Sequence, residues 1–177
     1  MFEFTCSVCG EVHRGAPSFS VAAPAQALFL PPSEQADRVE LSDDLCIIRP
    51  HDRDPYGEPM YFIRATLAIP IQGARRPFTW SLWVSQTEEC FYDYADSLGT
   101  DQRGVATLGD LTVSLPIYDD RPDGEPFADL PCTVEWGDAG KRPKIVLPAG
   151  NHPLSVDIHE GMAEERAAEL SEIMLHP

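Results

Sequence analysis

The sequence is poor in positive charge. It contains 13 lysines and arginines against 29 aspartates and glutamates, which gives a net charge of -16 at pH 7. Nucleic acids and anionic membranes bind proteins through basic surfaces, so this deficit argues against both as partners. The same charge favours solubility and would steer the protein toward a basic partner. A solvated acidic surface is the simpler interpretation of the charge.

Long apolar runs are also missing. No stretch approaches the length of a membrane span, and the start Met1-Phe2-Glu3-Phe4 has neither the basic residues nor the apolar run of a secretory signal. The five cysteines are an odd number, and without a secretory signal they point to a reducing compartment. We therefore expect a cytoplasmic protein whose thiols are free or bound to metal.

The 177 residues suit one domain with a real hydrophobic core, and the 17 scattered prolines disfavour an all-helical fold. We expect a single α+β domain over residues 1–177, with a mainly antiparallel sheet, a middle helix and a C-terminal helix. Within it, residues 1–14 would form a zinc knuckle. Residues 15–36, rich in alanine and proline, would be irregular apart from one short helix near residues 25–30, and residues 37–177 would form the α+β body.

Alternating apolar residues predict most of the strands. The clearest case is 78–85, where Phe78, Trp80, Leu82 and Val84 fall on one face. A capping box formed by Ser85 and Glu88 predicts that the middle helix starts there and runs to about residue 98. The C-terminal helix is expected over 162–175. Further strands are expected at 45–49, 60–71, 111–115, 130–136 and 144–147, the last two joined as a hairpin.

Two cysteines separated by two residues give the sequence its most definite chemistry. Cys6 and Cys9 are followed by Gly10, which can adopt the positive φ that lets backbone amides turn toward the sulfurs, and His13 lies three residues further on. Thiolate and imidazole are the ligands that zinc prefers. The sequence therefore predicts a zinc site at Cys6 and Cys9. A redox pair, a disulfide and free thiols in a turn are the alternatives.

One such knuckle supplies only two of the four ligands of a tetrahedral zinc site. His13 is near enough to be a third, although structural sites usually take their second pair from a distant segment. The sequence has no second C-x-x-C, so we expect His152 and His159 to be the distant donors. The metal ligands predicted from the sequence are thus Cys6, Cys9, His13, His152 and His159.

Four stretches of the sequence carry a resemblance to a known family: Cys6-x-x-Cys9-Gly10-x-x-His13, residues 41–46 with Phe62-Ile-Arg64, Phe78-x-Trp80-x-Leu-Trp83-Val84-Ser85, and His152-Pro153-Leu154. In these stretches the chain resembles a bacterial family of uncharacterised proteins, domain of unknown function 2199. The resemblance implies a shared fold and a shared metal or polar cluster, draws attention to Asp44, Cys46 and His152, and supplies no reaction. One departure is Ala163, where a Ser or Thr cap for the last helix is expected.

Three functions are compatible with these features. The first is a binding or structural domain stabilised by zinc, which recognises a protein or a small molecule. The second is a zinc-dependent hydrolase, in which the metal keeps one position for water and Glu11, Asp157 or Glu160 acts as the base. The third is an acidic immunity-type protein that neutralises a basic toxin, a hypothesis based on charge alone. The number of protein ligands on the metal distinguishes the first two.

Overall fold

Two long antiparallel strands, β6 (Met60–Ile69) and β7 (Phe78–Gln86), form the centre of the fold. Their pairing is continuous, from Tyr61 opposite Gln86 to Ile69 opposite Phe78. β-Branched and aromatic residues dominate both strands, as expected for a pleated surface buried on at least one face. The computed structural model describes residues 2–54, 56–113, 115–118 and 128–176.

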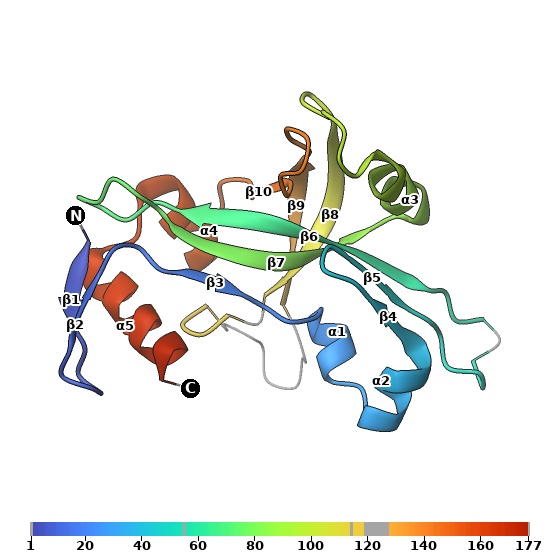
Figure 1. Cartoon of the computed structure of the whole chain (residues 1–177), viewed down its shortest axis with the longest axis horizontal. Helices are drawn as coiled ribbons and strands as arrows, with labels where there is room; N and C mark the ends of the chain where they lie inside the picture. The colour runs from blue at the N-terminus through green and yellow to red at the C-terminus, as the bar shows by residue number, and fades with distance from the viewer. Residues whose placement is uncertain (1, 55, 114, 119–127, 177) are drawn as a thin grey trace.

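Five strands close into a small barrel (Figure 1). β7 is followed by β8 (Ala106–Val113), β9 (Ala128–Glu135) and β10 (Lys144–Val146), each antiparallel to its predecessor. The ring closes where β10 runs parallel to β6, with Lys144 opposite Thr66. Because the ring closes, both β6 and β7 have a hydrogen-bonded neighbour on each side. The expected α+β fold with a mainly antiparallel sheet is confirmed, and the closed ring is a feature that the sequence did not predict.

The other elements surround this barrel. β3 pairs in parallel with β7, β5 and β4 extend the sheet beyond β6, and β1 and β2 form a separate hairpin. Their bounds are β1 (Glu3–Thr5), β2 (Val12–Arg14), β3 (Ser18–Ser20), α1 (Ala25–Leu28), α2 (Pro32–Arg38), β4 (Val39–Leu41), β5 (Leu45–Ile48), α3 (Glu88–Ser97), α4 (Pro153–Glu160) and α5 (Glu164–Leu175).

Figure 1 shows α1 and α2 at one end of the molecule, and the β1–β2 hairpin beside α5 at the opposite end. Both termini lie at this second end. The first segment of the chain and its last helix are therefore neighbours in space although they are far apart in sequence.

The main hydrophobic core fills the barrel and the space beneath α3, α4 and α5. The residues predicted to share one face of β7 are buried in it, since Phe78, Trp80 and Val84 are at most 1% exposed. Trp83, on the other face of β7, is also buried, in a smaller cluster with Cys46 and Phe62. The alternation therefore identified the strand correctly, but both of its faces are covered.

The middle helix begins two residues later than the capping-box pattern indicated. Thr87 is the N-cap of α3, and its hydroxyl accepts a hydrogen bond from the Cys90 amide at 3.3 Å. The predicted cap, Ser85, is still the penultimate residue of β7, and its hydroxyl accepts from the Asp110 amide. Glu88 accepts a hydrogen bond from the Tyr61 hydroxyl at 2.9 Å, which holds the start of α3 against β6.

Two differences from the predicted elements lie nearer the ends of the chain. Residues 15–36 contain β3, α1 at the expected place, and the start of α2. The segment after His152 forms the helix α4, which the sequence analysis treated as a loop. α5 matches its prediction, with Ala167 and Leu170 buried, and Ala163 at its N-cap makes no side-chain hydrogen bond. None of the helices in the described ranges is long and apolar enough to cross a bilayer.

The Thr87 cap can be tested by substitution. We expect Thr87→Ala to lower the free energy of unfolding by about 1 kcal/mol, because the Cys90 amide at the start of α3 loses its acceptor. Thr87→Ser keeps the hydroxyl and should stay within a few tenths of a kcal/mol of the wild type. Urea denaturation of the three proteins measures the difference. Equal losses in the two variants would show that the hydroxyl does not cap the helix.

Candidate metal centre

The β1–β2 hairpin brings the two N-terminal cysteines together. Phe4 lies opposite His13 in its ladder, and the turn between the strands is closed by hydrogen bonds from the Cys6 amide to the Glu11 carbonyl and from the Gly10 amide to the Cys6 carbonyl, both 2.9 Å. Gly10 has a φ of 75°, a conformation that side chains with a Cβ disfavour. The tight turn therefore depends on the glycine that follows the second cysteine.

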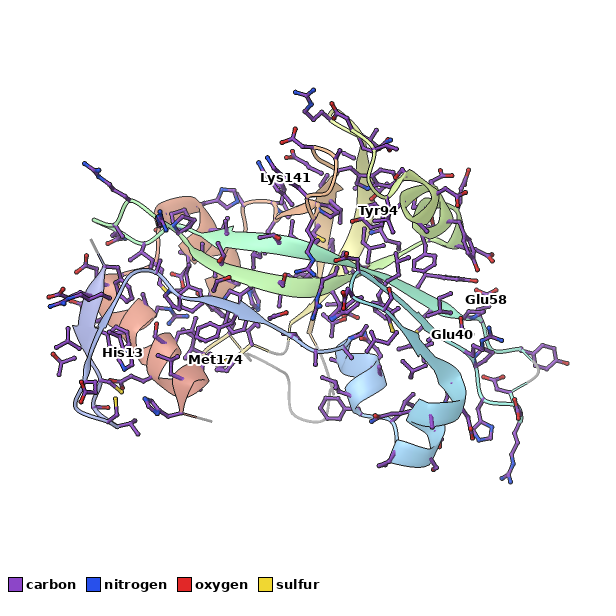
Figure 2. The ribbon with its side chains drawn as sticks, in the orientation of Figure 1. His13, Glu40, Glu58, Tyr94, Lys141 and Met174 are labelled. Carbon is purple, nitrogen blue, oxygen red and sulfur yellow. The ribbon has the colours of Figure 1, made fainter. Side chains whose placement is uncertain are left out.

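Four side chains converge at this turn. The thiols of Cys6 and Cys9 and the imidazoles of His13 and His176 each offer one ligand atom, and these atoms all lie within 4.8 Å of one another. Cys6 Sγ is 3.3 Å from His176 Nε2, and Cys9 Sγ is 3.4 Å from His13 Nε2. Figure 2 shows His13 at the same end of the molecule as Met174 of α5. The cluster joins the two ends of the chain.

The geometry of these four atoms suits a tetrahedral metal. Bond lengths of about 2.3 Å to sulfur and about 2.0–2.1 Å to nitrogen place a sulfur and a nitrogen on a tetrahedral metal roughly 3.5–3.6 Å apart. The two sulfur–nitrogen distances, 3.3 and 3.4 Å, are only slightly shorter than that separation. The set of two thiols and two imidazoles also contains only groups that bind soft or borderline metals. Cys6, Cys9, His13 and His176 can thus hold one metal ion.

The last helix is fastened to the turn independently of any metal. Glu172 of α5 accepts two hydrogen bonds from Ser7, from its amide at 2.5 Å and from its hydroxyl at 2.8 Å. These bonds, with a smaller contribution from the nearby histidines, hold the pKa of Glu172 below its usual value. The His176 amide donates to the Glu172 carbonyl at 3.1 Å, so the final turn of α5 sets the position of His176.

Packing fixes one side of the cluster more firmly than the other. Cys6 is 1% exposed, whereas Cys9 and His176 are exposed. The Phe4 ring stacks on the His13 ring with centroids 5.2 Å apart, and Phe4 packs against the main core. The rigid core of the protein therefore orients Cys6 and His13, while Cys9 faces solvent.

The structure does not bring His152 and His159 to this cluster. His152 is the N-cap of α4, and its Nδ1 accepts a hydrogen bond from the Leu154 amide at 3.2 Å. His159 lies near the end of α4, with Nε2 3.0 Å from the Leu147 carbonyl. His176 stands where these two were expected. The sequence analysis missed His176 because it considered only the apolar face of the final helix. The one available signal was a histidine directly after that helix.

The residues highlighted by the family resemblance have other roles. Asp44 accepts a hydrogen bond from Arg142 at 2.6 Å, far from the cysteine turn in sequence. Cys46 is completely buried, and burial raises the pKa of its thiol to about 12, so it packs as a neutral side chain. The metal cluster includes neither residue.

None of the three carboxylates considered as a catalytic base belongs to the metal cluster formed by the described residues. Asp157 instead accepts hydrogen bonds from the Tyr118 hydroxyl at 2.7 Å and from Arg166 at 2.9 Å. Glu11 contributes its backbone carbonyl to the cysteine turn, and no side-chain contact within the described ranges assigns a role to Glu160.

Comparison with known proteins gives one match. A sequence model of the family described as an uncharacterized protein conserved in bacteria (DUF2199) matches residues 5–162. The matched region includes Cys6, Cys9 and His13, and it ends before α5 and His176. Searches among curated proteins and among solved structures gave no match.

The attachment of α5 to the cysteine turn makes a prediction about local opening. We expect Glu172→Ala to accelerate hydrogen exchange of the Ser7 amide severalfold, because that amide loses its acceptor. Glu169, an exposed residue of the same helix, provides the matched control Glu169→Ala. Amide exchange followed by NMR on both variants measures the effect. An unchanged rate in Glu172→Ala, or the same acceleration in Glu169→Ala, would contradict the contact.

Proposed function

The chain belongs to the uncharacterized bacterial family DUF2199, and from that premise we propose that it is a binding domain whose two ends are joined by a zinc ion. Cys6, Cys9, His13 and His176 would be the four ligands. The observation that carries this proposal is the convergence of two thiols and two imidazoles within 4.8 Å.

A metal at this position would act as a long-range crosslink. It would connect the β1–β2 hairpin to the residue after α5, and Cys6 and His176 are separated by 170 positions in the chain. All four donors come together only in the folded chain, so the free energy of metal binding would add to the stability of the fold. The hairpin has only three residues in each strand, and a two-stranded hairpin alone is marginally stable.

The donor set favours zinc among the common metals. Magnesium and calcium prefer oxygen ligands, and no carboxylate is part of this cluster. Two cysteines and two histidines are a common ligand set of structural zinc sites. Of the divalent metals that such a set can bind, zinc also has no redox chemistry, which suits a purely structural role.

The same donor set favours a structural site over a hydrolytic one. Catalytic zinc sites have three protein ligands and an open position for water, whereas four protein ligands close the tetrahedron. The zinc-dependent hydrolase considered from the sequence therefore gains no support from this cluster. The acidic immunity-type hypothesis still rests on net charge alone, since no contact among the described residues selects a basic partner.

A cytoplasmic location is part of the same proposal. A site that uses two thiolates needs its cysteines reduced, and all five cysteines are free thiols in the structure. A reducing compartment would preserve them.

Metal content tests the ligand set. We expect the purified protein to carry about one zinc per chain, with an X-ray absorption spectrum that fits two sulfurs and two nitrogens. His176→Ala should lose most of the zinc at a fixed chelator concentration, because a ligand is removed. His152→Ala is the matched control and should retain it. Zinc loss in His152→Ala with retention in His176→Ala would show that the ligand set is wrong.

Stability tests the structural role. We expect Cys9→Ser to lower the free energy of unfolding of the zinc-loaded protein by about 2.7–4.1 kcal/mol, the stabilisation that a ligand of the folded state gives at 100–1,000 times its dissociation constant, because the altered site no longer binds zinc tightly. Cys90→Ser, in the middle helix, is the control and should change stability by less than about 1 kcal/mol. Chemical denaturation with and without added zinc measures both. If zinc does not stabilise the wild type, the crosslink role is excluded.

A further inference from the structure

A hollow of about 760 Å³ lies at the end of the barrel, where α3 faces the loop between β9 and β10. Figure 2 shows Lys141 of this loop and Tyr94 of α3 at the same end of the molecule. A second hollow of about 450 Å³ adjoins it, sharing the loop and adding Arg103. The lining of the first hollow includes Thr66, Tyr94, Trp136, Lys141, Arg142 and Lys144. We call it the Lys144 hollow.

The Lys144 hollow concentrates positive charge in an acidic protein. The chain has only two lysines, Lys141 and Lys144, and both line this hollow beside Arg142. With net charge -16, a cation in this chain would most often be surrounded by carboxylates. Two carboxylates, Asp44 and Asp138, also line the hollow, so its lining carries a net charge of about +1. A concave site with net positive charge is a local exception in this acidic chain, and concave sites focus electrostatic fields.

The three cations differ in how far their charge is neutralised. Arg142 is held by Asp44 at 2.6 Å and by the Ser81 hydroxyl at 2.9 Å, bonds that use its Nε and Nη1. Lys141 pairs with Asp138 at 2.6 Å. Lys144 has no hydrogen-bond or ion-pair partner among the described residues. Within the described part of the chain, the hollow thus contains one ammonium group without an ion-pair partner and one guanidinium that is held in place while its Nη2 makes no hydrogen bond.

Two aromatic rings form the apolar part of the wall. Tyr94 and Trp136 meet edge to face with ring centroids 5.3 Å apart, and each is less than 10% exposed. Burial, with a further contribution from Asp44, raises the pKa of Tyr94 to about 12. The tyrosine therefore stays neutral at physiological pH and adds no negative charge. Both rings line the hollow, and the small part of each that remains exposed gives the site an apolar wall.

We propose that the Lys144 hollow binds a small organic anion, with Lys144 and Arg142 contacting its phosphate or carboxylate group and the Tyr94–Trp136 wall contacting a flat ring. The size of the hollow falls in the range of small-molecule sites, which are mostly apolar with a few convergent polar groups. A charged hydrogen bond from a pre-positioned arginine gives such a site its orientation. This inference specifies the ligand class of the proposed binding domain and does not depend on the zinc crosslink.

Three probes with the same ring and different head groups test the proposal. The full-length, zinc-loaded protein is titrated with phenyl phosphate, benzoate and benzyl alcohol, and binding is followed by NMR shifts of the Tyr94 and Trp136 signals. We expect saturable binding of at least one of the two anions, and binding of benzyl alcohol weaker by about tenfold or more, since the alcohol lacks the charge that pairs with Lys144. Comparison of phenyl phosphate with benzoate identifies the preferred anionic group.

Two variants distinguish binding in the hollow from a nonspecific effect of the protein's net charge. Lys144→Gln should weaken anion binding by about fivefold to tenfold, because the free ammonium is removed. Arg75→Gln changes the net charge equally at an exposed position in another part of the chain, so its binding should be unchanged. No saturable binding of either anion, equal binding of benzyl alcohol, or equal weakening by the two variants would each overturn the proposal. Metal content measured on the same samples reports on the zinc proposal separately.

Discussion

The ladder between β6 and β7 is the interaction on which the rest of the fold depends. Its two strands contribute buried residues to both faces of the sheet, so the barrel core lies on one side and the cluster around Trp83 lies on the other. β8 and β10 continue from the outer edges of this pair, and their connection through β9 closes the ring. β7 leads directly into the Thr87 cap, which places α3 and Tyr94 over one end of the barrel. The Lys144 hollow lies at that end, so its geometry follows from the same ladder.

The metal cluster and the Lys144 hollow use different parts of the chain. The cluster joins the β1–β2 hairpin to the residue after α5, whereas the hollow is built from α3, β6 and the β9–β10 loop. Figures 1 and 2 show these elements in separate regions of the molecule. In the proposed division of roles, one site keeps the chain ends in place and the other recognises a ligand. Such a division fits a binding domain, in which the recognition site sits on a scaffold stabilised elsewhere.

Local patterns carried most of the information that the sequence could supply. Alternation in 78–85 identified β7, and the spacing of Cys6, Cys9 and Gly10 identified the turn that the structure shows. The Thr87 cap was missed because Ser85 and Glu88 match the same short pattern, and only the extent of β7 distinguishes the two possibilities. The burial of both faces of β7 could not be predicted from the sequence either, because it depends on where α1 packs.

Long-range pairings were the harder part. No local pattern links His176 to Cys6, because their proximity depends on α5 packing its Ala167 and Leu170 face into the core. His152 offered a better local signal and proved to be a helix cap, a role that a polar residue before Pro153 could have suggested. The closure of the barrel was hard to predict for the same reason. The parallel pairing of β10 with β6 depends on how all five strands are arranged, and no local pattern in either strand indicates it.

The position of His176 has a consequence for biosynthesis. The other three members of the cluster lie within the first 13 residues. At about 5–20 residues per second the ribosome needs roughly 8–33 s to add the 163 residues from Arg14 to His176. During that interval the nascent hairpin has only three of its four donors. A partly ligated metal would be open to exchange with other thiols in the cell, so the fourth bond would be made only after α5 has left the exit tunnel and docked.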